Sequence, residues 1–476
     1  MSYLRDDKYI NVDNDISIID PEMETKPKFT ISSEILEDTI FNRINLLFML
    51  ILELINLIFL GHENSNNNNN YIKFNFYIIG TYYIYLFGFY LNLGIIKSLN
   101  FDIERYNHYI LLKKLTYYFS FLIILPFSFL SYFILNYIYS SKDKVINDNI
   151  NKIFKEYILF SSIFCQFLIM FLLNLKFFQK NFMRSQAIWF SFIFYVIYIL
   201  NLYCFLYKLH LGYKAITFSL TISSFICYYF SNDTISEDFK HNHKKIKNFY
   251  FIPDNHKILD DYLVKHYNEI FKISLKLYID RFPYAMAYLF SFFIGKYYMS
   301  CNIILMNLFL ILHAISKGLS ATIKNYIQYS SNIKKNSHFA KIRFIKIFSI
   351  VNICTALFFC FLIFLFNENI CYIYISHPHE IIKKFFNNYL YCFIFTIFID
   401  FFKQELEGYI KGIYTSNNIL IYKIIAIFVF LPMGFALCFL LNNGLKGFWL
   451  AILFSICFQC VPHSINVYKN YEVFLI

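Results

Sequence analysis

An aspartate on a strongly apolar segment is the side chain of this sequence best placed to do chemistry. Asp400 lies within Ile399–Gly412, eight residues before the first glycine of the pair Gly408-x-x-x-Gly412. Burying a carboxylate at the centre of a membrane-spanning helix costs about 2.5 to 3.5 kcal/mol on insertion scales. Acids retained at that cost usually face a bundle interior or a water-filled cavity, where they bind ions, protons or substrates. The pattern points to a transporter, and Gly408 and Gly412 are expected to let two helices pack closely.

A second acid, Asp280, also lies in an apolar segment, but its neighbours leave two interpretations open. Lys276 precedes it by four residues and Arg281 follows it directly, so Asp280 is either a cation-coupling acid or half of a structural ion pair. His313 is either a proton carrier or a helix-packing histidine. The candidates for a cavity or substrate site are Asn56, Glu53, Asn307, His313 and Gln404.

Three other residues have simpler explanations. Glu405 and Glu407 lie nearer to the cytosolic end of their segment, where we expect both carboxylates to be hydrated. Trp449 lies near the start of the last apolar segment, and tryptophan is enriched where helices meet the membrane–water interface. We therefore expect Trp449 to anchor its helix at that interface.

The elements that must position these side chains are membrane-spanning helices. The chain is 58% hydrophobic and only 16% charged, whereas soluble domains average about 25% charged residues. Its mean hydropathy is +0.47. Apolar runs of roughly 18 residues or more predict an all-α membrane protein. The twelve expected spans are 40–61, 72–96, 113–139, 156–178, 184–207, 211–230, 269–296, 300–322, 344–366, 386–410, 418–441 and 447–469.

Lysine and arginine set the expected orientation. Basic residues are denser on the connections that are cytosolic when the N-terminus is inside, which predicts an N-in, C-in topology. Residues 1–39 then form a cytosolic polar tail, and 470–476 a cytosolic C-terminus. The formal net charge of +12 is mostly this topology signal, so a nucleic-acid partner is not expected. The expected partners are membrane lipids, in the plasma membrane or an organelle membrane.

Metal and enzyme chemistry find little support in the sequence. Cys457-x-x-Cys460 lies in the last span without a second pair of ligands, so no metal site or cofactor is expected. An embedded enzyme should show clustered histidines or acids beside a membrane face. The one cluster of this kind, His377-Pro-His379-Glu380, is expected in an exposed loop. We therefore do not expect an enzyme.

Matching glycines indicate an internal duplication. Gly212 and Gly444 open the sixth and twelfth spans and lie 232 residues apart, while Gly61 and Gly295 close the first and seventh and lie 234 apart. The common offset predicts an N-lobe at 40–230 and a C-lobe at 269–469, joined by a cytosolic loop at 231–268. Internal repeats of this kind are typical of transporters, whose substrate sites lie between the repeats.

The order and spacing of several short motifs resemble the multidrug and toxic compound extrusion (MATE) transporter family over roughly residues 40–470. Ile58-Phe-Leu-Gly61-His62 resembles the end of the family's first helix, and Gly408-Tyr-Ile-Lys411-Gly412 stands where the family has Gly-x-x-Arg-Gly. Further similar segments are Leu175–Gln179, Leu312–Ala321, Leu431–Gly434 and Gly444–Trp449. Lys411 replaces the family's usual arginine, and Ser316 its usual proline.

The resemblance implies two six-helix lobes in a V around a central cavity. It also implies an antiporter that exports organic cations or drug-like metabolites by alternating access, in exchange for protons or sodium. We expect a monomer. Asp280, fifteen residues before Gly295, and Asp400 stand at the positions of the family's functional acids. Both are expected to face one C-lobe cavity. Asn56 stands where some prokaryotic members have an aspartate, and Glu53, one turn earlier, is the alternative acid.

Two other functions remain open at this stage. One is a flippase of lipid-linked substrates from the same superfamily, which would have a larger lateral opening and often more spans. The other is a transport-inactive structural membrane protein. The twelve spans and the Gly-x-x-Lys-Gly pattern favour the antiporter.

Overall fold

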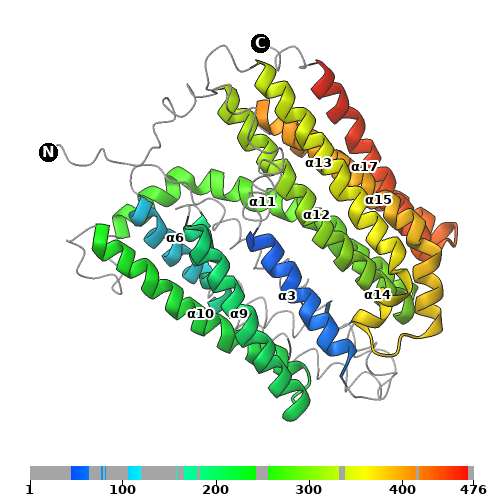
Figure 1. Ribbon diagram of the computed structural model, residues 1–476, viewed down its shortest axis with the longest axis horizontal. Coiled ribbons are helices and arrows are strands. Elements are labelled where there is room, and N and C mark those ends of the chain that lie inside the picture. Colours follow the sequence, from blue (N-terminus) through cyan, green and yellow to red (C-terminus); the bar gives the residue numbers. More distant parts are fainter. Residues whose placement is uncertain are drawn as a thin grey trace, which may run out of the picture.

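The computed structural model is helical throughout its described regular structure (Figure 1). It describes residues 44–63, 75, 77–78, 81, 105–119, 157, 166–179, 183–242, 256–331, 338–413 and 417–469. The predicted tail 1–39, the C-terminal segment 470–476 and most of the spans predicted at 72–96 and 113–139 lie outside these residues. Six described helices are long and apolar enough to cross a membrane: Ser185–Lys208, Tyr297–Ile327, Ile345–Leu365, Glu380–Gly412, Ile419–Leu440 and Gly444–Tyr468.

The N-terminal half surrounds an aromatic core. Its described helices are α3 (Ile44–Gly61), α6 (Arg105–Phe119), the apolar helix Gln166–Gln179, α9 (Arg184–Tyr203) and α10 (Tyr213–Asn242). Phe48 of α3 packs edge-on against Phe194 of α9, and Phe194 stacks on Phe171 with ring centroids 5.5 Å apart. These buried rings hold three helices together through contact area and ring geometry.

The C-terminal half is built around one central helix. Its elements are α11 (His256–Ile294), α12 (Lys296–Ser331), α13 (His338–Leu365), α14 (Asn367–Tyr374), α15 (Glu380–Ile413), α16 (Asn417–Phe435) and α17 (Gly444–Lys469). Helix α12 packs against α11, α13, α15 and, from the other half, α3. Of its apolar window 83% is buried, against 22% for Ile419–Leu440, so α12 forms the core while α16 presents its side chains outward.

The same helical irregularity occurs in both halves. A short π-helix, Cys204–Lys208, follows α9, and another, Ala436–Leu440, follows α16. Their positions differ by the 232 residues that separate Gly212 from Gly444. In both, a backbone N–H reaches back five residues at 3.0 Å, as expected of π-turns.

The turns after these π-helices also match residue by residue. His210 and Asn442 have φ of 51° and 54°, and Gly212 and Gly444 have φ of 56° and 52°. Glycine is suited to this left-handed region because it lacks a Cβ. Two turns with one geometry at one offset support the duplication predicted from the sequence.

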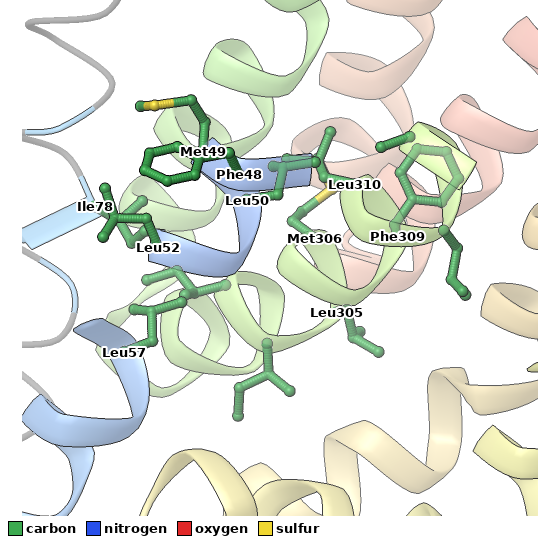
Figure 2. Close-up of a cluster of buried hydrophobic side chains, with 14 of the residues drawn as sticks. Phe48, Met49, Leu50, Leu52, Leu57, Ile78, Leu305, Met306, Phe309 and Leu310 are labelled. Atoms are coloured by element: carbon green, nitrogen blue, oxygen red, sulfur yellow. The ribbon is translucent and has the colours of Figure 1, made fainter. Parts of the chain in front are cut away.

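Helix α3 lies where the two halves meet. Figure 2 shows Leu50 of α3 in the same buried cluster as Met306 and Leu310 of α12. At the end of α3, a Cβ on Gly61 would stand only 1.7 Å from the carbonyl oxygen of Tyr374. Only a glycine permits this approach, which seats the end of α3 against the end of α14.

Candidate functional site

Two glycines bring α15 close to α12. A Cβ on Gly408 would stand 2.9 Å from the backbone oxygen of Ser320, and one on Gly412 would stand 2.7 Å from the Cβ of Ile327. The missing side chains let the helices approach closely, as small residues do in membrane bundles. This contact places the polar face of α15 directly against α12.

Asp400 is the centre of a buried polar cluster between these helices. It is 1% exposed, and its Oδ2 lies 2.7 Å from Nδ1 of His313 and 3.2 Å from Oγ of Ser316, both on α12. Its Oδ1 lies 2.9 Å from Nζ of Lys403, one turn further along α15. A buried carboxylate with a cationic partner and two further donors has the environment that its charge requires.

His313 extends this cluster towards α11. Its Nε2 lies 3.5 Å from the hydroxyl of Tyr284, and its ring stacks on Phe309. A neutral imidazole protonated on Nδ1 donates to Asp400 and leaves Nε2 to accept from Tyr284. The three side chains thereby form a hydrogen-bonded chain across α11, α12 and α15.

Asp280 takes part in a second charged cluster. Its two carboxylate oxygens lie 3.2 Å from Nζ of Lys317 on α12 and 3.0 Å from Nζ of Lys423 on α16. These ammonium groups come from other helices, whereas the sequence drew attention to Lys276 and Arg281. Asp280 is thus part of an ion-pair network across α11, α12 and α16, and both interpretations, a coupling acid and a structural pair, stay predictions.

The network continues to an acid that we expected to be hydrated. Lys423 also lies 3.4 Å from Oε2 of Glu407, and Lys411 lies 2.6 Å from the same oxygen. Glu407 is 0% exposed and Glu405 is also buried, so the expectation of hydration was wrong for both. Glu405 accepts hydrogen bonds from Ser349, from Asn352 at 2.8 Å and from Tyr409 at 2.9 Å. The bundle supplies partners here in place of water.

The two clusters share one face of α12. His313, which binds Asp400, lies four residues before Lys317, which binds Asp280. Side chains four residues apart stand one above the other on a helix. The structure therefore brings both predicted acids to the same face of α12, each through its own basic partner.

The other candidates lie at three further places. Asn56 donates to Tyr77 at 2.7 Å and accepts from Tyr198, so its amide is engaged within the N-terminal half. The remaining pair links the two halves, because Asn307 of α12 donates to Glu53 of α3 at 3.3 Å. Gln404 is fully buried on α15. Neither Nε2 nor Oε1 of its amide has a hydrogen-bond partner in the described part of the chain.

Two lysines of the site were missed by sequence reasoning. Lys317 and Lys423 each stand in an apolar span, at 300–322 and 418–441. A lysine in such a span costs about as much as an aspartate, about 2.5 to 3.5 kcal/mol at the helix centre, and so carries the same functional signal. We applied this argument to the acidic side chains of the sequence but not to its lysines.

Trp449 corrects another expectation. It is 0% exposed, with ring centroids 5.2 Å from Phe393 and 6.0 Å from Phe309. A position near the start of a span suggested the membrane interface, but α15 and α12 cover the indole. Trp449 is a core residue, and the expected interfacial anchor was wrong.

Solved MATE transporters share this architecture along nearly the whole chain. The eukaryotic MATE transporter AtDTX14 aligns with a TM-score of 0.63 and 13% identity, covering 94% of this chain and 99% of that one. A multidrug resistance MATE transporter of the MOP superfamily aligns in its outward-facing conformation with a TM-score of 0.67 and 13% identity, over 93% and 96%. Its inward-facing counterpart gives 0.63 and 14%, over 90% and 95%.

Sequence comparison alone does not reach this result. The sequence matches no protein-family model, and no curated protein is significantly similar to it. At 12–14% identity the likeness to the solved structures is one of fold. It confirms the predicted fold class, an all-α, multi-pass integral membrane protein with two six-helix lobes. The chain therefore has the fold of the multidrug and toxic compound extrusion transporters.

Proposed function

We propose that this chain is a secondary active antiporter, and not an enzyme, that exports organic cations or drug-like metabolites in exchange for protons or sodium. The observation that carries this proposal is the buried cluster of Asp400, His313 and Lys403 within a MATE fold. A titratable acid is retained inside a membrane protein chiefly where ions or substrates move.

Lys403 gives Asp400 a tethered counter-ion. While the carboxylate is ionised, the ammonium group at 2.9 Å balances its charge. A proton or sodium ion that binds to Asp400 replaces part of this attraction and frees Lys403 to move. Because His313 contacts the same carboxylate from α12, the change at Asp400 reaches the α12–α15 contact. Binding of the coupling ion thereby acts on the packing of the C-terminal half.

Asp280 is the second coupling acid in this proposal. It lies between Lys317 and Lys423, so its charge is also balanced by tethered ammonium groups. A cationic substrate competes with these groups for the carboxylates, and aromatic side chains such as Tyr284 offer cation–π contacts. Export in this mechanism alternates between lysine-bound and ligand-bound acids.

The decisive experiment measures efflux from proteoliposomes under an imposed proton or sodium gradient, with a planar aromatic cation such as ethidium as probe. Asp400→Asn alone leaves the Lys403 ammonium buried without its partner, which costs about 3–5 kcal/mol. The sharper variant is Asp400→Asn combined with Lys403→Met, which removes both charges together. We expect this double variant to fold, to bind the probe and to lose gradient-driven efflux.

Asp233→Asn, an exposed acid on α10, is the matched control and should transport as the wild type does. A wild-type efflux rate that depends on neither the proton nor the sodium gradient would contradict antiport. Efflux by the double variant at the wild-type rate would contradict the role of Asp400. Movement of lipid-linked substrates in place of the organic cation would favour a flippase.

A further inference from the structure

A buried histidine of α17 lies beside the charged network. His463 is 0% exposed, and in the described part of the chain neither Nδ1 nor Nε2 of its ring has a hydrogen-bond partner. Helix α17 packs along α15 and α16, and the ring of Tyr422 on α16 meets the imidazole edge-on, with ring centroids 5.7 Å apart. By contrast, the other buried histidine of the described residues, His313, is bonded through both nitrogens. His463 therefore needs a polar partner that these helices do not supply.

A carboxylate oxygen on α15 also lacks a partner. Glu407 is 0% exposed, and its Oε2 lies 2.6 Å from Nζ of Lys411 and 3.4 Å from Nζ of Lys423. Its Oε1 has no hydrogen-bond partner within the residues that the structure describes. Glu407 acts electrostatically on the His463 ring, although no hydrogen bond joins the two side chains in those residues. The carboxylate and the imidazole are thus close enough to interact but do not bond directly.

Two unsatisfied polar groups that interact across a helix contact are a common setting for a bound water. Leaving a buried hydrogen-bonding atom unpaired costs the desolvation of that atom, and the cost is greater for a charged group. Buried waters in proteins typically bond to groups of this kind. A water between the two helices donates to Oε1 of Glu407 and to the unprotonated nitrogen of His463, which satisfies both atoms.

The charges around His463 favour water over an ion. Three ammonium groups act on the ring, those of Lys403, Lys411 and Lys423, against one carboxylate. This positive surplus disfavours a metal or another cation, and no group of three or more metal-ligating side chains occurs among the described residues. The unpaired oxygen of Glu407 repels an anion. The ligand that fits is a neutral molecule that both donates and accepts, and between fully buried side chains on packed helices it must be small.

We propose that Glu407 and His463 hold an ordered water molecule between α15 and α17. The water solvates the carboxylate oxygen that the lysines leave free, so Glu407 remains ionised inside the bundle. It also joins α17 to the ion-pair network that links α11, α15 and α16 through Lys423. The site goes beyond the proposed function, because it requires neither a substrate nor a coupling ion.

Radiolytic hydroxyl footprinting of the full-length protein in lipid nanodiscs tests the site without a substitution. X-rays convert bound water into hydroxyl radicals, which oxidise adjacent side chains even where bulk solvent does not reach, and mass spectrometry measures the modified fraction. We expect His463 to be modified. Met306, equally buried in the apolar cluster of Figure 2, should remain intact although methionine is intrinsically the more reactive residue. If His463 stays as unmodified as Met306, the proposal is overturned.

Two substitutions test the water bridge through stability. His463→Leu removes both ring nitrogens at similar volume and deprives the water of a partner, so Oε1 of Glu407 loses solvation. We therefore expect the thermal unfolding midpoint to shift downwards. His463→Gln keeps a donor and an acceptor that can hold the water, and it should recover most of this shift.

Ser223→Ala is the matched control, because it removes a fully buried hydroxyl that has no hydrogen-bond partner among the described residues. A single polar atom does not hold a water, which needs more than one polar partner, so the midpoint should stay the same or rise. In a dry site His463→Leu would behave in the same way, since it exchanges an unpaired polar ring for an apolar group. A midpoint that His463→Leu leaves unchanged or raises, or that both His463 variants lower equally, would overturn the bridging water.

Discussion

The positions 232 residues before the charged side chains of α15 lie on an apolar helix of the N-terminal half, Gln166–Gln179. The positions that correspond to Asp400, Lys403 and Glu407 are held by Leu168, Phe171 and Leu175, all of them fully buried. The turns after the π-helices, by contrast, agree in position and in backbone angles. The two halves therefore share a backbone plan and differ in the charges that they bury.

Within its described residues, and apart from Glu53, the N-terminal half pairs its buried polar side chains mainly with neutral groups. Asn174 accepts a hydrogen bond from Tyr109 and donates to Ser231 at 2.8 Å. The corresponding region of the C-terminal half contains buried lysines and carboxylates instead. Neutral hydrogen bonds fix a structure with little dependence on ions, whereas buried charges respond when a proton or cation arrives. Among the described residues, the ion-paired carboxylates therefore lie in the C-terminal half, and Glu53 is a buried acid of the N-terminal half.

The largest expected effect follows from removing Lys423, which neutralises two acids. Lys423→Met leaves Asp280 and Glu407 short of a partner, and breaking a buried pair costs about 3–5 kcal/mol. We expect a marked fall in the thermal unfolding midpoint of the detergent-solubilised protein. Lys446→Met, at an exposed lysine, is the control and should leave the midpoint unchanged. A stable Lys423→Met protein would show that the network carries little stability.

The counterpart of Lys423 in the other half is Ser191, whose hydroxyl donates to the carbonyl of Ala187 at 2.8 Å. Ser191→Ala should cost no more than about 1 kcal/mol, the usual value of one hydrogen bond. Equal losses at Ser191 and Lys423 would remove the contrast between the halves.

The next effect concerns the contact that positions Asp400. In Gly408→Leu the new side chain meets the Ser320 backbone, which would have to shift by more than its packing allows. We expect loss of stably folded protein in the membrane, measured by monodispersity after solubilisation. Gly434→Ala is the control, since its Cβ would meet the ring of Phe290 at an ordinary 3.5 Å. Normal folding and transport of Gly408→Leu would contradict the close packing of α12 and α15.

His313 offers a finer test of the ion response. His313→Gln keeps a polar group beside Asp400 but cannot accept a proton as imidazole does. If His313 carries protons, the variant should lose proton-driven efflux and keep sodium-driven efflux and stability. Equal loss under both gradients would indicate that His313 only positions the carboxylate. The measurement is initial efflux from proteoliposomes under each gradient in turn.

The smallest effect is expected in the neutral network. Tyr109→Phe removes one donor to Asn174 and should cost about 1 kcal/mol of stability. Gradient-driven efflux should not change, because this cluster contains no titratable acid. A change in coupling greater than the change in stability would extend the ion response to this neutral network.

Much of the fold could be predicted from the sequence, for identifiable reasons. Long apolar runs have few stable forms in a bilayer, since every backbone polar group must be bonded within the segment. Gly212 and Gly444 marked the duplicated turn because its backbone angles suit glycine. The site was predicted less completely. Asp400 and His313 were each named, but no local pattern joined them across 87 residues.

The sequence by itself determined that the chain spans a membrane, that it repeats, and which carboxylates are expensive to bury. These properties depend on composition and on spacing along one helix. The tertiary structure decided which side chains of other helices meet the acids: Lys317 and Lys423 for Asp280, and His313 for Asp400. It also decided that Glu407 and Trp449 are buried. The physical reason is that partners and burial depend on how helices pack, and close approaches such as that at Gly408 set this packing between segments far apart in sequence.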